Sequence, residues 1–103
     1  MLIENAVKQE YDSVNAAYEN AANCLTKESG MAYGESLRAF AATVRDYFAE
    51  TQTFDSERDR LLKVVFQEIK AIRRSPYNFD NYIANKVVTD IVSELFSLTG
   101  IQN

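Results

Sequence analysis

The chain contains no histidine, one cysteine, one proline and three glycines in 103 residues. The missing histidine removes the commonest general base and metal ligand at neutral pH. A single cysteine cannot form a disulfide within the chain, and a lone thiol is commoner in reducing compartments. Apolar runs are only a few residues long, far short of the roughly 20 that span a bilayer. The sequence therefore predicts a cytoplasmic protein without membrane contact.

The composition is that of a packed protein. Hydrophobic residues make up 47% of the chain, and 11 basic residues face 15 acidic ones, for a net charge of −4. This content argues against disorder, and the acidic balance argues against a protein that coats nucleic acid or anionic membranes. The length fits a single domain over residues 1–103.

Glycine and proline divide the chain into segments whose apolar residues recur at helical spacing, and no segment alternates like a strand. The predicted helices cover residues 2–26, 35–50, 56–74 and 78–98. Residues 27–30 are interpreted as the end of the first helix. Residues 30–34 are interpreted as a short loop, or as a single turn that packs Met31 or Tyr33 against the core. The predicted fold is all-α, a compact antiparallel four-helix bundle.

Two helices carry unusual faces. The apolar seam of the first includes Tyr11 and Tyr18, whose hydroxyls need partners. Either these hydroxyls reach the rim of the bundle, or the seam is a docking groove or dimer face. The apolar residues of the last helix cover well over half of its circumference. That helix is either central in the bundle or part of a subunit contact, so a homodimer is a further prediction.

Residues for catalysis are scarce. Cys24 is the sole thiol and has no histidine to activate it, so we expect a half-buried packing residue. The closely spaced acids, such as Asp90 with Glu94, fall at polar helix positions and are interpreted as solvated surface. The glycines at 30 and 34 are not followed by the Lys-Ser or Lys-Thr of a phosphate-binding loop. We expect no enzyme activity, no catalytic residue, no metal site and no cofactor.

The distribution of charge is more informative. Residues 1–54 hold four basic and eight acidic residues, whereas residues 60–74 hold five basic residues and one acid, Glu68. Such asymmetry can steer a charged partner to one end of a molecule. Arginine and aromatic side chains are enriched at binding hot spots and crowd together around residue 76. The predicted partner-binding residues are Lys70, Arg73, Arg74, Tyr77, Phe79 and Tyr82.

The alternative is a structural role for the same residues. The cations would complement the carbonyl end of the third helix, and the aromatic rings of the following loop would pack on the core.

These features favour a non-catalytic, small acidic helical protein that works through protein–protein interaction, as a regulator, an immunity-type inhibitor or an adaptor, with an unidentified protein partner. The alternative function is a nucleic-acid-binding regulator that uses the basic end of the third helix, with affinity that falls steeply with salt. A third hypothesis is an enzyme or small-molecule carrier with a pocket between the helices.

Overall fold

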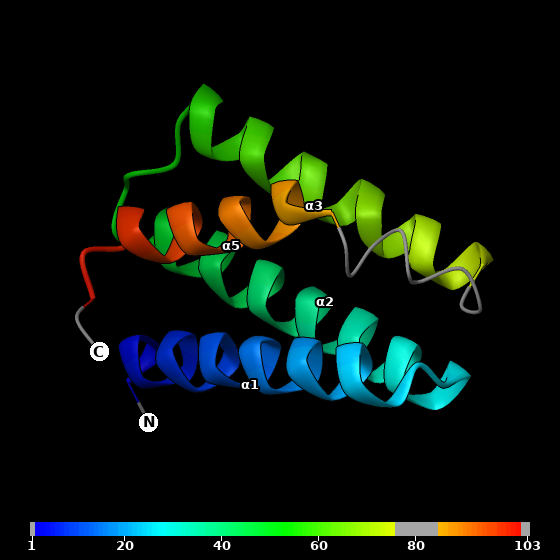
Figure 1. Cartoon of the computed structure of the whole chain (residues 1–103). Coiled ribbons are helices and arrows are strands. Elements are labelled where there is room, and N and C mark those ends of the chain that lie inside the picture. Colours follow the sequence, from blue (N-terminus) through cyan, green and yellow to red (C-terminus); the bar gives the residue numbers. More distant parts are fainter. Residues whose placement is uncertain (1, 76–84, 102–103) are drawn as a thin grey trace.

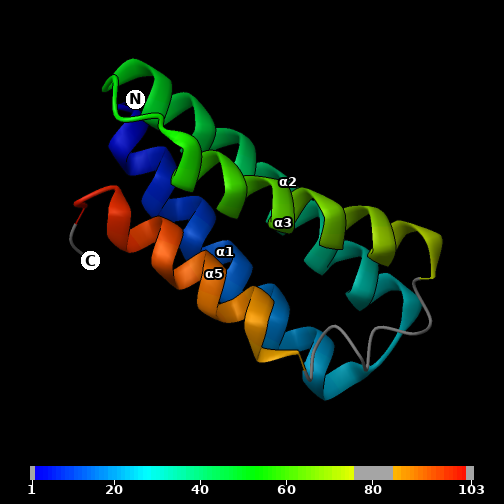
Figure 2. The same cartoon turned by 90° about the horizontal axis from the view of Figure 1, so that it is seen from above.

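The computed structural model describes residues 2–75 and 85–101, and this part of the chain forms four helices and no strand. The helices are α1 (Ile3–Cys24), α2 (Lys27–Glu50), α3 (Ser56–Arg74) and α5 (Lys86–Leu98). Successive helices run in opposite directions (Figures 1 and 2). The packing order is closed, because α1 packs on α2, α2 on α3, α3 on α5, and α5 back on α1. The predicted all-α four-helix bundle is confirmed.

Every helix contributes to one apolar core, and α2 contributes the largest share. The buried apolar residues are Val7, Val14, Ala21, Tyr33, Leu37, Phe40, Ala41, Val44, Phe48, Leu61, Leu62, Val65, Ile69, Ile72, Val88, Val92, Leu95 and Phe96. They recur at steps of three, four or seven, with three adjacent pairs, and this spacing places them on one side of each helix. The helices therefore shelter one another along those sides and leave the opposite sides to solvent.

The start of α2 differs from the prediction, because residues 27–34 are helical rather than the end of one helix and a loop. Thr26 is the N-cap, and its Oγ1 accepts the backbone N–H of Ser29 at 3.1 Å. In return Ser29 Oγ accepts the backbone N–H of Thr26 at 3.0 Å. This is a capping box with serine in the place usually held by glutamate or glutamine. The first helix accordingly ends at Cys24, not at residue 26, and Leu25 makes the turn in a left-handed conformation with φ 51°.

Gly34 lies inside α2 because it brings that helix close to α3. A Cβ atom at this position would lie 3.3 Å from Cγ2 of Ile72, a tight contact. The neighbouring Tyr33 is 1% exposed and belongs to the core, whereas Met31 is 38% exposed. The glycine that suggested a loop in the sequence therefore serves helix packing.

The last predicted helix, 78–98, is not continuous. Asn85 has extended backbone angles, and its Oδ1 accepts the N–H of Val87 at 3.1 Å, so it caps a helix that begins at Lys86. Residues 78–84 of that prediction lie outside the described residues. At the other end Gly100 adopts φ 74°, as expected for a left-handed cap, and Ile101 packs against the core.

The wide apolar arc of α5 is used inside the molecule. Its large apolar side chains are buried or half-buried, with the exception of Val87, which is 56% exposed. Contacts with both α3 and α1 explain the width of the arc, since two neighbours cover more of the circumference than one. The described part of the helix therefore uses most of this arc within the chain, and the subunit contact stays a prediction.

Different parts of the chain lie at the two ends of the bundle. The N-terminal end of α1 and the C-terminal end of α5 lie at one end together with the connection between α2 and α3, and we call this the terminal pole (Figures 1 and 2). The turn between α1 and α2 and the C-terminal end of α3 lie at the other end, which we call the basic pole.

Candidate functional site

Three of the six predicted partner-binding residues lie in the structure at the basic pole. Lys70, Arg73 and Arg74 occupy the last turns of α3, and all three are exposed. The helix closes at Ser75, whose N–H donates to the carbonyl of Ala71 at 3.1 Å. The other three predicted residues, Tyr77, Phe79 and Tyr82, lie outside the described residues. The structure therefore brings together the basic half of the predicted site.

Two of these cations, Lys70 and Arg74, belong to a longer stripe on the solvent side of α3, and Arg73 lies outside it. Its members follow at steps of three, four, three and four, which at 3.6 residues per turn confine them to an arc of about 80°. All are exposed, and the stripe lies opposite the core side of the helix. We call this stripe the basic face, and it consists of Arg60, Lys63, Gln67, Lys70 and Arg74. The cations were predicted from the sequence but their alignment was not, although the three-and-four spacing of these residues carries it.

The N-terminal half of α3 neutralises its own cations. Arg60 Nη2 lies 3.4 Å from Glu57 Oε1, and Lys63 Nζ lies 3.0 Å from Asp59 Oδ2. Arg58 also pairs with the N-cap, Asp55. The backbone N–H of Arg58, which donates to the Asp55 carboxylate, is the main cause that lowers the pKa of Asp55.

The C-terminal half of α3 keeps its positive charge. Across residues 2–75 and 85–101, no carboxylate lies within ion-pair distance of Lys70, Arg73 or Arg74. Cations at this position are favourable for the helix itself, because its terminal carbonyls carry partial negative charge. Within the described part of α3, the cations of the N-terminal half are therefore paired with acids and those of the C-terminal end are not.

The one acid of this half, Glu68, makes no ion pair with these cations among the described residues, and its carboxylate is partly buried. Its Oε1 is buried without a hydrogen-bond partner, and burial raises the pKa of Glu68. Close by, the pKa of Tyr33 is raised well above its ordinary value. Burial is the main cause, and the charges of Tyr18 and Glu68 add to the effect. The rings of Tyr18 and Tyr33 meet edge-on at 5.7 Å. Tyr33 is buried in this cluster, and Tyr18 and Glu68 are partly buried.

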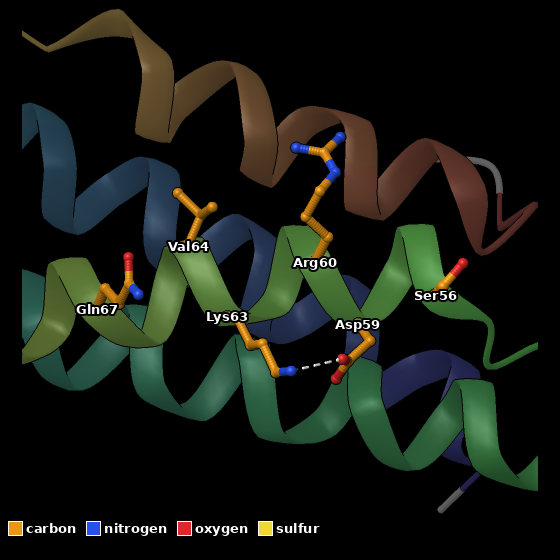
Figure 3. Close-up of a pocket in the computed structure, with 6 residues that line it drawn as sticks. All are labelled: Ser56, Asp59, Arg60, Lys63, Val64 and Gln67. Carbon is orange, nitrogen blue, oxygen red and sulfur yellow. Dashed lines mark ion pairs between the residues drawn. The ribbon is translucent and has the colours of Figure 1, made fainter.

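A hollow of about 390 Å³ lies beside the N-terminal half of the basic face (Figure 3). In the view of Figure 3 the paired Asp59 and Lys63 point downward from α3, and Arg60 and Val64 point upward. The lining residues are Ser56, Asp59, Arg60, Lys63, Val64 and Gln67, all from α3. Because small-molecule sites bury most of their ligand, a hollow walled by one helix is better suited to a side chain of a partner.

The tyrosine seam of α1 is covered near the terminal pole. The ring of Tyr11 stacks on that of Phe96 with centroids 4.1 Å apart, and its hydroxyl lies 3.4 Å from Ser93 Oγ. The docking-groove interpretation is therefore wrong at Tyr11, because α5 already occupies that position. Farther along α1, Cys24 is exposed rather than half-buried as predicted, since it lies at the last residue of the helix.

Comparisons with protein-family models, with curated proteins and with solved structures find no match for this chain. In the described ranges, no three Cys, Asp or Glu side chains come together in a way that could hold a metal ion. None of the helices in those ranges is long and apolar enough to cross a membrane.

Proposed function

We propose that this protein is a non-catalytic interaction protein that binds an acidic surface of a partner protein through the C-terminal end of α3. The observation that carries the proposal is the contrast along that helix. Its N-terminal cations are each paired with an acid, whereas Lys70, Arg73 and Arg74 are exposed and have no acidic partner among the described residues.

Such a surface attracts acidic partners in preference to other proteins. Charges at the rim of an interface set the association rate and exclude wrong partners more than they add affinity. The negative excess of residues 1–54 strengthens this selectivity, because it repels an acidic partner from the rest of the molecule. A regulator, an inhibitor or an adaptor could each work in this way, and a cytoplasmic location is part of the proposal.

Nucleic-acid binding by the same residues is the alternative. A phosphate backbone that followed α3 would meet three uncompensated cations and then the acid-paired Arg60 and Lys63. Since each phosphate contact adds to affinity and to its salt dependence, so few contacts predict weak binding. The pairing of the N-terminal cations therefore favours a protein partner.

The test is affinity capture from the native host with three forms of the tagged protein. One form is unmodified and one carries Lys70→Gln, Arg73→Gln and Arg74→Gln. The matched control, Lys8→Gln, Arg38→Gln and Lys86→Gln, removes the same charge from α1, α2 and α5. We expect one stoichiometric partner with the unmodified and control forms and its loss with the α3 variant. Failure to recover a partner, or its retention by the α3 variant, would contradict the proposal.

A further inference from the structure

The basic face has the dimensions of a helix-binding surface. From Arg60 to Arg74 it extends for 14 residues, or about 21 Å at 1.5 Å per residue. It lies on a single straight helix, so a partner that follows it must be elongated. A second α-helix repeats its own side chains at steps of three and four and can therefore meet the face turn by turn.

The charge along this surface is graded. Near Lys70 and Arg74 a carboxylate of a partner would find a cation that has no acidic partner in residues 2–75 and 85–101, but near Arg60 and Lys63 it would approach the acids that already pair with them. The face therefore favours a partner whose acidic residues are confined to one half.

The same charge gradient along α3 determines in which direction a partner helix runs relative to α3. Acidic side chains stabilise the N-terminal turn of a helix, so an acidic N-terminal half is favourable for the partner itself. If that half lies over the C-terminal end of α3, the two helices are antiparallel, and the positive end of one dipole lies beside the negative end of the other.

We propose that the basic face of α3 is the docking site for an acidic α-helix of a partner protein, antiparallel to α3, with carboxylates in its N-terminal half over Lys70 and Arg74, which Arg73 flanks. This inference rests on the proposed function and names the partner's chemistry. In the neutral C-terminal half of the partner, one apolar side chain enters the hollow beside Val64, which is half-buried at its edge (Figure 3).

Other occupants fit the surface less well. Phosphates repeat uniformly along a nucleic acid, whereas the free charge of the face is confined to one end. In a second copy of this chain, the acids of residues 1–54 are interspersed with Lys8, Lys27, Arg38 and Arg45. An acidic helix with its charge in one half matches the gradient better than either.

The test uses two labelled helical peptides of about 18 residues with the same composition. One has its glutamates in the N-terminal half and a leucine in the C-terminal half, and the other has the two halves exchanged. Anisotropy at low salt should show that the acid-first peptide binds at least about fivefold more tightly, since several exposed ion pairs each contribute a fraction of a kcal/mol.

The Lys70→Gln, Arg73→Gln and Arg74→Gln variant should lose this preference, and the Lys8, Arg38 and Lys86 control should keep it. Amide shifts on titration should concentrate on α3.

Equal affinity for the two peptides, no binding at low salt, or unchanged binding by the α3 variant would each overturn the inference. So would tighter binding of a DNA duplex that displaces the peptide, or an oligomer of the unmodified protein that the α3 variant abolishes. The proposed function is judged separately by the capture experiment. If a partner depends on the three cations but neither peptide binds, the proposed function is supported and the acidic-helix inference fails.

Discussion

Glu68 is an ionisable residue whose surroundings disfavour its charged form. It is the only acid among residues 60–74, where five cations would solvate its charge at the surface. Its side chain is nevertheless partly buried, and Oε1 has no hydrogen-bond partner. Burial without such a partner disfavours the ionised form, which is why the pKa of Glu68 is raised.

This shift predicts a pH-dependent cost. Because the pKa in the folded state lies above the unfolded value, the contribution of Glu68 to stability is greatest below the ordinary glutamate pKa of about 4.3 and is lost as the pH rises through the folded pKa. Glu68→Gln should therefore unfold at higher urea than the unmodified protein at pH 7, and the difference should shrink toward pH 4. The exposed Glu94→Gln is the control. A difference that stays constant between pH 4 and pH 7 would contradict the assignment.

The conformation of Leu25 is a feature that its residue type does not predict. It ends α1 in a left-handed conformation that glycine usually adopts, and nothing in its chemistry signals this role. The sequence predicted the turn after the first helix at Gly30, several residues beyond its position at Leu25. Gly100, by contrast, adopts the left-handed conformation that its residue type predicts.

Among the elements, α2 departs most from the prediction. Its capping box was present in the sequence, but serine at the fourth position is a weaker signal than glutamate, and two nearby glycines favoured a loop. Whether a glycine breaks a helix or allows it to pack closely depends on a neighbour that is distant in sequence. Here that neighbour is Ile72, which the segment around Gly34 cannot reveal.

The close approach of α2 to α3 predicts a specific coupling. Gly34→Val should lower the free energy of unfolding by about 2 kcal/mol, because its side chain must displace Cγ2 of Ile72. Ile72→Ala alone should cost about 2–5 kcal/mol, since it leaves a cavity in the core. In the double variant the two changes compensate in volume, so the combined loss should be smaller than the sum. Urea unfolding of the four forms measures this coupling, and strictly additive losses would show that the contact is unimportant.

For the molecule as a whole, the structure depends on the contact that closes the ring of helices. Tyr11 of α1 stacks on Phe96 of α5, and Tyr47 of α2 donates its hydroxyl to the carbonyl of Thr99 at 2.9 Å. The seam pattern predicted that Tyr11 faces inward, but periodicity alone could not say that α5 covers it. The charge asymmetry was likewise visible in the sequence, whereas the pairing that leaves only one half of α3 uncompensated required side-chain positions.

Closure through Tyr11 can be tested with two substitutions. Tyr11→Ala should destabilise the protein by about 2–4 kcal/mol, because it removes a large ring packed between α1 and α5. Tyr11→Phe should cost less than about 0.5 kcal/mol, since it keeps the ring and loses only a long contact to Ser93. Chemical unfolding gives both values, and hydrogen exchange should show earlier opening of α5 in the alanine variant. Equal stability of the two variants would mean that the ring stack does not hold α5.

The closed order of packing has a mechanical consequence. Since the N-terminal end of α1 and the C-terminal end of α5 both lie at the terminal pole, a force applied to these two ends pulls the neighbouring helices apart from one end (Figure 2). The stack of Tyr11 on Phe96 would carry the load first, and the remaining contacts would then separate one after another. The bundle should therefore yield to low tension in this direction and resist far more when it is stretched from pole to pole.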